Sequence, residues 1–266
     1  MPIKQFAEIQ DSPYRRFLIQ GPPGTGKSVF AATCPSPLFV FDFDNMISIY
    51  AQITSDLTYA QFEMSPKGWN DFTLTLDTVL KQQKSSTPPP YKTIIFDSAT
   101  KLADLALEFA LQLDPSRDET EGPVWNIHYK MVKNLVSGKI RQATQFGANA
   151  NFVLICHTKE SKNTDGAIIS IDPLLPGDMS TKTPSDFGEV LFSGVTKDKE
   201  NNTQYYLQTT TVGLRKARSH LRGVYNLLPD RVPNTYPQLM QYYTKAKEAK
   251  EAKEAKNTPR KDQNND

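Results

Sequence analysis

The chain has little cysteine and no long apolar run, and each shortage excludes a class of protein. Only two cysteines, Cys34 and Cys156, occur in 266 residues. They provide neither a disulfide framework nor the paired spacing of a zinc site. No apolar run approaches the ~18 residues of a membrane-spanning helix, and the first six residues do not resemble a secretory signal. We therefore expect a cytoplasmic protein with no membrane partner.

The chain also lacks a large excess of positive or negative charge. The sequence has 31 Lys and Arg against 29 Asp and Glu, a formal net charge of +2. This balance neither favours nor excludes a nucleic-acid partner, which would need a local basic patch. The apolar content is sufficient for a substantial core, and the length allows one large α/β domain or one domain with additions.

A glycine-rich motif stands near the beginning of the chain. Residues 21–28 match the pattern G-x-x-x-x-G-K-[S/T] at every fixed position, between a strand-like run and a helix start. Backbone N–H groups of such a loop, with the helix N-terminus, bind phosphate oxygens. We expect Lys27 to reach the β- and γ-phosphates and Ser28 to hold Mg²⁺. The predicted contacts to the nucleotide are Gly21, Pro22, Pro23, Gly24, Thr25, Gly26, Lys27, Ser28 and Val29.

Strand-like and helix-like segments alternate after the motif. Apolar runs at 37–42, 91–98 and 151–157 are typical of buried parallel strands. Helical spacing of apolar residues lies between them, which predicts an α/β fold with a mostly parallel central sheet flanked by helices. The remaining expected segments are a short helix at 46–53, a strand at 57–64, helices at 69–83, 102–109 and 125–146, a polar loop with one hairpin at 158–188, antiparallel strands at 189–196 and 204–211, and a helix at 236–256.

The chain divides by composition into four parts. These are an N-terminal arm at 1–14, a core at 15–225, a helical segment at 226–256 and a disordered tail at 257–266. The end of the helical segment repeats Lys, Glu and Ala with a period of three and has no large apolar face. We expect a solvated helix there, with nucleic-acid or partner contact as the less favoured alternative.

Polar residues end the strands that lead toward the glycine-rich loop. Ligands of open parallel sheets bind at the carboxyl ends of the strands. We expect Asp97 to hold Mg²⁺ opposite Ser28, although it could also cap the following helix. Asp44 is our candidate general base, with Asp42 as its competitor, and a charged turn that caps the next helix is the structural alternative.

Three further residues are candidates for chemistry. His157 ends a strand, where it could sense the γ-phosphate and pass the change to the loop that follows. A histidine satisfied by backbone groups is the equal alternative. Lys216 and Arg218 are two residues apart, and could stabilise transition-state charge within the subunit or across an interface. A basic, solvated edge strand is the structural alternative.

These motifs, in this order, resemble the RecA-type core over residues 14–225. They are most similar to the compact phage ATPases of that lineage described as single-strand annealing recombinases. The resemblance implies a RecA-like ATPase that uses ATP and Mg²⁺, binds single-stranded DNA and supports recombination or annealing. It implies that Asp44 is the catalytic carboxylate. It also implies that His157 couples the nucleotide to DNA, at a position where the family often has glutamine. Lys216 and Arg218 match the spacing of the pair that acts on a neighbouring subunit's phosphate.

The resemblance also implies partners. Residues 158–188 hold the position of a DNA-binding loop, while the second such loop, at 114–124, is acidic here. The large flanking domains of RecA are absent. We expect a homo-oligomer with nucleotide at its subunit interfaces, a single-strand-binding protein as a candidate partner, and the host cytoplasm if a phage encodes the chain.

Two other functions stay open. One is a nucleotide-dependent loader or packaging accessory protein that hydrolyses ATP slowly. The other is a small-molecule kinase with a P-loop, which would need arginines in a lid. Arg117, the one arginine in either long loop, lies among acidic residues, and this counts against a kinase.

Overall fold

A central sheet organises the molecule. The computed structural model describes residues 14–114, 122–145, 149–223, 226 and 228–257. Within this part of the chain the sheet has nine strands in the order β11-β9-β8-β1-β5-β4-β2-β3, with β10 also paired to β8. The strands are β1 (Arg16–Gln20), β2 (Leu38–Asp42), β3 (Leu57–Gln61), β4 (Thr93–Asp97), β5 (Asn151–Cys156), β8 (Glu189–Lys197), β9 (Thr203–Gln208), β10 (Arg218–Ser219) and β11 (Arg231–Pro233).

The sheet is parallel from β3 to β8 and antiparallel beyond it. The pairs β3–β2, β2–β4, β4–β5, β5–β1 and β1–β8 are parallel. The pairs that involve β9, β10 and β11 are antiparallel. The predicted α/β fold with a mostly parallel central sheet and an antiparallel C-terminal extension is therefore confirmed.

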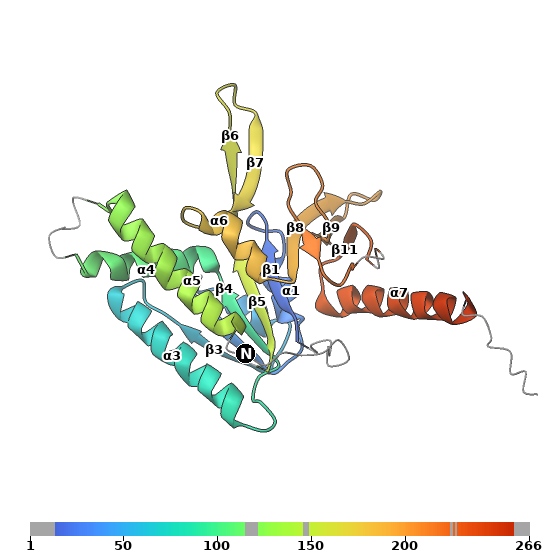
Figure 1. The fold of residues 1–266 in the computed structure, drawn as a ribbon, viewed down its shortest axis with the longest axis horizontal. Helices are drawn as coiled ribbons and strands as arrows, with labels where there is room; N and C mark the ends of the chain where they lie inside the picture. The colour runs from blue at the N-terminus through green and yellow to red at the C-terminus, as the bar shows by residue number, and fades with distance from the viewer. Residues whose placement is uncertain (1–13, 115–121, 146–148, 224–225, 227, 258–266) are drawn as a thin grey trace, which may run out of the picture.

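Helices cover both faces of the sheet (Figure 1). Residues of α3, α4 and α5 pack in one apolar core, and residues of α1, α2 and α7 pack in the other. The helical segments are α1 (Lys27–Ala32), α2 (Ser48–Ala51), α3 (Pro66–Ser85), α4 (Ala99–Gln112), a π-helical turn (Trp125–Tyr129), α5 (Lys130–Gln145), α6 (Met179–Lys182), a 3-10 turn (Thr183–Asp186) and α7 (Tyr236–Asn257). Across the described residues, no helix combines the length and the apolar character that a membrane crossing needs.

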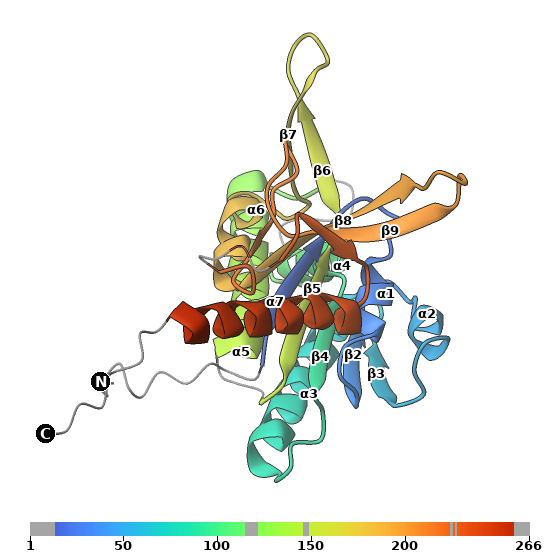
Figure 2. The same ribbon diagram turned by 90° about the vertical axis from the view of Figure 1, so that its right-hand side faces the viewer.

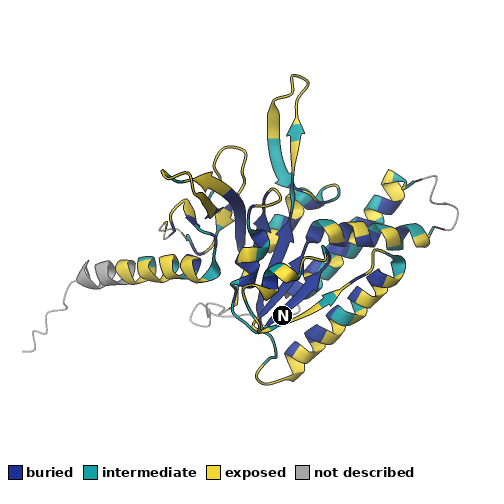
Figure 3. Cartoon of the chain, turned by 180° about the vertical axis from the view of Figure 1, so that it is seen from behind, coloured by how far each residue is buried: buried dark blue, intermediate teal, exposed yellow. Residues whose placement is uncertain are grey.

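The strands are buried on both faces. In β2, Phe39 and Phe41 belong to the core under α3 to α5, while Leu38 and Val40 belong to the core under α1. Successive side chains of a strand point to opposite faces, so a continuous apolar run fills both cores at once. Figure 3 shows the resulting buried centre, with the exposed face of α7 standing apart from it.

The parallel register brings the strand ends together. Asp42 pairs in register with Asp97, and Gln20 pairs with Cys156. The residues that follow β1, β2, β4 and β5 therefore meet at one edge of the sheet. This edge is where the sequence places its phosphate loop and its polar strand ends.

Two of the expected segments have different outcomes. The helix expected at 46–53 is only the four residues of α2. The hairpin expected within 158–188 is present, because β6 (Thr158–Lys162) and β7 (Ile168–Pro173) form a two-stranded sheet. The side chain of Asn163 closes the turn of this hairpin by accepting hydrogen bonds from the backbone N–H groups of Asp165 and Ala167. The hairpin projects from the body, as both Figure 1 and Figure 2 show.

Other expectations fall outside the described residues. They concern residues 1–13 of the arm, most of the acidic loop at 114–124, and the tail from 258. The domain boundaries stay a prediction.

Candidate active site

The phosphate loop connects β1 to α1 and depends on glycine. Gly24 and Gly26 have φ angles of +74° and +83°, in the left-handed region that disfavours other residues. A Cβ atom at Gly26 would lie 2.4 Å from Asn234 Nδ2. Backbone conformation and close approach therefore both require glycine at this position.

Two side chains from the C-terminal extension hold the loop from outside. Ser193 Oγ, on β8, donates to the carbonyl of Thr25 at 2.5 Å. Asn234 Nδ2 donates to the carbonyl of Gly26 at 2.8 Å. Both residues are buried. Because they fix two consecutive carbonyls, they hold the loop backbone in one conformation before any ligand binds.

The ammonium of Lys27 lies at the loop. Its Nζ donates to the carbonyls of Gly21 at 3.0 Å and Pro22 at 2.7 Å. Burial lowers the pKa of Lys27, and the nearby carboxylates of Asp97 and Asp44 partly oppose this. Lys27 therefore lies buried at the loop and lines a cavity beside it.

Asp97 ends β4 directly opposite Ser28. Its Oδ2 accepts hydrogen bonds of 2.7 Å from both Ser28 Oγ and Tyr50 OH. Burial raises the pKa of Asp97 to about 6. A hydroxyl beside a carboxylate is the oxygen donor set that Mg²⁺ takes from a protein when phosphates and water supply its other ligands. Ser28 and Asp97 therefore fit the metal that the sequence predicts.

The structure distinguishes Asp42 from Asp44. The carboxylate of Asp42 is buried and accepts from the backbone N–H groups of Met46 and Ile47, and from Gln61 Nε2. It thus caps the turn before α2. Asp44 is partly exposed and, within the described part of the chain, accepts one hydrogen bond, from Ser98 Oγ at 3.2 Å. Of the two, Asp44 has the free lone pairs that a general base needs.

His157 lies next to Asp44. Its Nε2 is 3.8 Å from Asp44 Oδ2, and its buried Nδ1 has no hydrogen-bond partner among the residues that the structure describes. Its backbone joins the β6–β7 hairpin, because the N–H of Leu174 donates to its carbonyl at 2.7 Å. The residue is therefore in contact range of both the phosphate edge and the hairpin, as a coupling role requires.

These groups line a common cavity of about 420 Å³. Its walls include Lys27, Ser28, Asp44, Asp97 and His157. A second cavity of about 650 Å³ continues from it, since both are lined by Gly24, Gly26, Val29 and Ile49. The second cavity adds Tyr205 on β9 and the segment 233–235.

Lys216 and Arg218 do not lie with the other predicted residues. Lys216 Nζ pairs with Asp172 Oδ1 at 2.6 Å. Arg218 donates to the carbonyls of Pro184 and Phe187. Both line a different cavity, of about 340 Å³. Their predicted action on a neighbouring subunit stays a prediction.

Several residues of the site carry no signal in the sequence. Tyr50, Ser193 and Asn234 contact Asp97 or the phosphate loop from segments up to 208 residues distant. Serine and asparagine in a strand or turn are too common to be singled out. Lys101, which also lines the 420 Å³ cavity, could have been found from its place four residues after Asp97, in the first turn of a helix.

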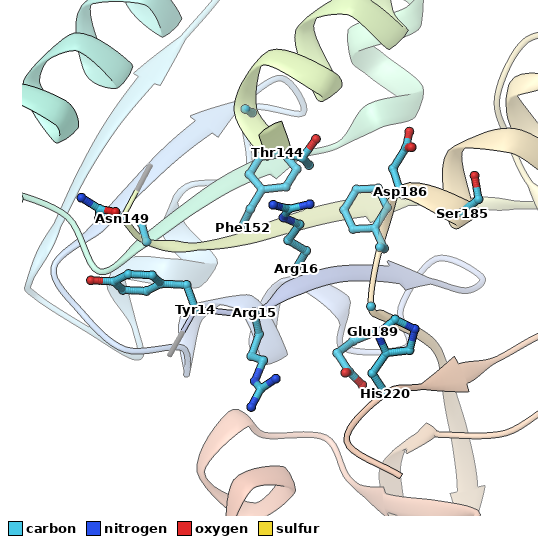
Figure 4. Close-up of a pocket in the computed structure, with 14 residues that line it drawn as sticks. Tyr14, Arg15, Arg16, Thr144, Asn149, Phe152, Ser185, Asp186, Glu189 and His220 are labelled. Carbon is cyan, nitrogen blue, oxygen red and sulfur yellow. The ribbon is translucent and has the colours of Figure 1, made fainter. Parts of the chain in front are cut away.

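A further cavity, of about 520 Å³, lies at the opposite edge of the sheet (Figure 4). Arg16, Phe152 and Glu189 line it from the beginnings of β1, β5 and β8. Figure 4 shows Arg15 and Arg16 pointing to opposite sides of the chain. Among the described residues that line this cavity, no buried side-chain nitrogen or oxygen lacks a hydrogen-bond partner. The geometry thus points to the other edge for chemistry.

Comparisons with known proteins place the chain in a family. A family model described as an AAA domain matches residues 14–219. No curated protein matches the chain. Solved structures that resemble it include the flagellar accessory protein FlaH from Methanocaldococcus jannaschii, with 12% identity, a TM-score of 0.37, and coverage of 82% of this chain and 83% of that one. Another is an ATPase from the type III secretion system of pathogenic bacteria, with 12% identity, a TM-score of 0.44, and coverage of 89% and 63%.

Proposed function

The chain belongs to the AAA domain family, and from this premise we propose that it is a Mg²⁺-dependent ATPase that binds single-stranded DNA and supports phage-type recombination or strand annealing. Hydrolysis of a nucleotide follows from the family. The DNA partner and the role in recombination are the proposal. They rest on the resemblance to RecA-type recombinases and on the hairpin next to the catalytic edge.

The observation that carries the ATPase assignment is the convergence of four groups on one cavity. The phosphate loop, the Ser28–Asp97 pair, Asp44 and His157 come from the ends of four different segments and line the same space. The polyphosphate of ATP would occupy this cavity. Its ribose and base would extend into the adjoining 650 Å³ cavity, where Tyr205 offers an aromatic face.

The residues have separable roles in hydrolysis. Lys27 and the loop bind the phosphates, and Asp44 orients a water molecule and accepts its proton. The water oxygen forms a bond to the γ-phosphorus, the bond from that phosphorus to the bridging oxygen breaks, and ADP leaves with the electron pair. Mg²⁺, held by Ser28 and Asp97, would supply a positive charge that neutralises phosphate oxygens.

The DNA would lie along the β6–β7 hairpin. Lys159 and Lys162 are on its first strand, where they can contact phosphates. His157 directly precedes β6 and lies 3.8 Å from Asp44. This continuity gives DNA on the hairpin a short route to the hydrolytic site.

A homo-oligomer with nucleotide at its interfaces is part of the proposal. Lys216 and Arg218 line a cavity separate from the phosphate site of their own subunit. A role for them at a phosphate would therefore need a neighbouring subunit.

The test is the steady-state rate of ATP hydrolysis with and without single-stranded DNA, at two salt concentrations. We expect stimulation of several-fold that weakens at high salt, because lysine–phosphate contacts release counterions. Hydrolysis without any stimulation would favour the loader or packaging function instead. Transfer of phosphate to a nucleoside or metabolite would favour the kinase.

A further inference from the structure

The phosphate cavity contains a lysine that the functions above do not use. Lys101 lies in the first turn of α4 and lines the cavity together with Lys27, Asp44 and Asp97. Lys27 and Lys101 are the two amino-group cations among the described residues of the lining. The γ-phosphate brings further negative charge to a space that already holds two carboxyl groups, so a second cation is electrostatically favoured there.

The local structure does not explain why a lysine stands at this position. A positive charge in the first turn opposes the helix macrodipole, and the first turn of α4 has no acidic residue. The ammonium pairs with Asp104 at 3.1 Å, three residues on, with both side chains about half exposed. Such an exposed pair contributes little to stability. Residues that break a local rule are expected at functional sites.

The backbone of Lys101 is tied to the catalytic edge. Its N–H donates to Ser98 Oγ at 3.5 Å, and that same hydroxyl donates to Asp44 Oδ1 at 3.2 Å. The start of α4 and the candidate base are thus joined through Ser98. Among the described residues the ammonium has one ion-pair partner, the exposed Asp104, so it is able to contact a phosphate that binds in the cavity.

We propose that Lys101 is a catalytic residue that contacts the γ-phosphate of ATP within its own subunit. It stabilises the negative charge on the γ-phosphate oxygens and stays protonated throughout, while the water proton goes to Asp44. Lys216 and Arg218, which the sequence offers as charge-stabilising groups, are bound to other partners in the same subunit. The inference depends on the proposed ATPase activity.

The test compares Lys101→Ala and Lys101→Arg with the wild type. We expect Lys101→Ala to lower kcat by about 100-fold or more, the range for loss of one charge-stabilising donor, and Lys101→Arg to restore part of it. Affinity for ADP should change less than 2-fold, since ADP has no γ-phosphate. Affinity for a β,γ-imido analogue of ATP should fall by several-fold.

A matched control and a mixing experiment sharpen the test. Lys67 also forms an exposed ion pair on a helix, with Asp71 on α3, and lines neither cavity of the site. Lys67→Ala should therefore behave as the wild type. The mixing experiment combines Lys101→Ala with Lys27→Ala. The Lys27→Ala subunit keeps Lys101 but lacks the lysine of its phosphate loop. If Lys101 acts within its own subunit, the mixture should have no more activity than the two variants separately.

The outcomes are distinguishable. Wild-type kcat in Lys101→Ala, while Lys27→Ala is inactive, overturns the role of Lys101 and leaves the ATPase function in place. Recovery of activity on mixing overturns the action within one subunit. A wild-type protein that does not hydrolyse ATP overturns both the inference and the function on which it rests.

Discussion

At the scale of single residues, Asp42 and Asp44 show how neighbouring carboxylates take different roles. Asp42 accepts three hydrogen bonds and is buried, whereas Asp44 is partly exposed beside His157. We expect Asp44→Asn to lower kcat by about 100-fold or more, the range for loss of a general base, with ATP binding retained. Wild-type hydrolysis in Asp44→Asn would exclude it as the base.

Asp42→Asn is the matched control for that experiment. The asparagine amide has one oxygen, whereas the carboxylate of Asp42 accepts hydrogen bonds with two. We therefore expect the Asp42→Asn variant to have a free energy of unfolding about 1–3 kcal/mol lower than the wild type, the cost of unsatisfied buried hydrogen bonds. Chemical denaturation of both variants measures this difference. Equal destabilisation by the two substitutions would contradict the assignment.

Glu189 provides a test of buried charge away from the catalytic edge. It is buried at the start of β8 and accepts from Ser219 Oγ and the N–H of Leu221. Burial raises its pKa, so the native state binds a proton more tightly than the unfolded state. Its protonation therefore adds stability below the ordinary pKa of glutamate, and this stability is lost as pH rises through the native pKa.

We expect the stability of the wild type, relative to Glu189→Gln, to increase as pH falls from neutral through the native pKa of Glu189. Glutamine does not titrate, so the variant removes only this contribution. Denaturant titrations of both proteins at a series of pH values measure the difference. A difference that stays constant with pH, or that reverses sign, would contradict the burial argument.

At the scale of elements, the sequence predicted most strands because both faces of the sheet are buried. The segments that form β2, β4 and β5 are apolar at nearly every position. Each can therefore be identified as a buried strand without knowing which strands lie next to it. The phosphate loop was equally clear because its glycines and lysine have fixed spacing. The β6–β7 hairpin was less visible, since β6 has no apolar residue. The bounds of α2 were also less clear, since the apolar residues Ile47 and Ile53 flank it on both sides.

The support of the phosphate loop could not be predicted. Ser193 and Asn234 contact it from segments 168 and 208 residues away. Such contacts follow from the position of β8 next to β1, which the sequence leaves open. The different environments of Asp42 and Asp44 likewise depend on the turn before α2. There the N–H groups of Met46 and Ile47 donate to the carboxylate of Asp42 and not to that of Asp44.

The β6–β7 hairpin is an element that can be removed without cutting the main sheet. It forms its own two-stranded sheet and projects from the body. We expect replacement of residues 159–172 by a short Gly-Ser linker to abolish stimulation of hydrolysis by single-stranded DNA. Basal hydrolysis should stay within about 3-fold of the wild type, because the phosphate cavity keeps its lining up to His157.

DNA binding by fluorescence anisotropy, together with the ATPase rate, checks this prediction. The double substitution of Lys81 and Lys84 by alanine, on α3 away from the phosphate cavity, controls for a general loss of positive charge. Unchanged stimulation in the hairpin variant would place the DNA elsewhere on the protein.

At the scale of the whole molecule, one edge of the sheet gathers what the chain needs for chemistry. The parallel strands deliver Ser28, Asp44, Asp97 and His157 to that edge, and the antiparallel extension holds the loop from outside. The two layers of helices bury both faces of the sheet and keep these strand ends in register. We therefore propose that function at this scale depends on nucleotide binding at that edge.

Equilibrium binding of a fluorescent, non-hydrolysable ATP analogue tests this claim most directly, with Mg²⁺ and with EDTA, for the wild type and Lys27→Ala. The account predicts saturable binding that weakens by at least 10-fold without Mg²⁺ and in Lys27→Ala, in line with loss of a charge-assisted phosphate contact. Binding of equal strength in all cases, or no binding by a folded wild-type protein, would contradict it.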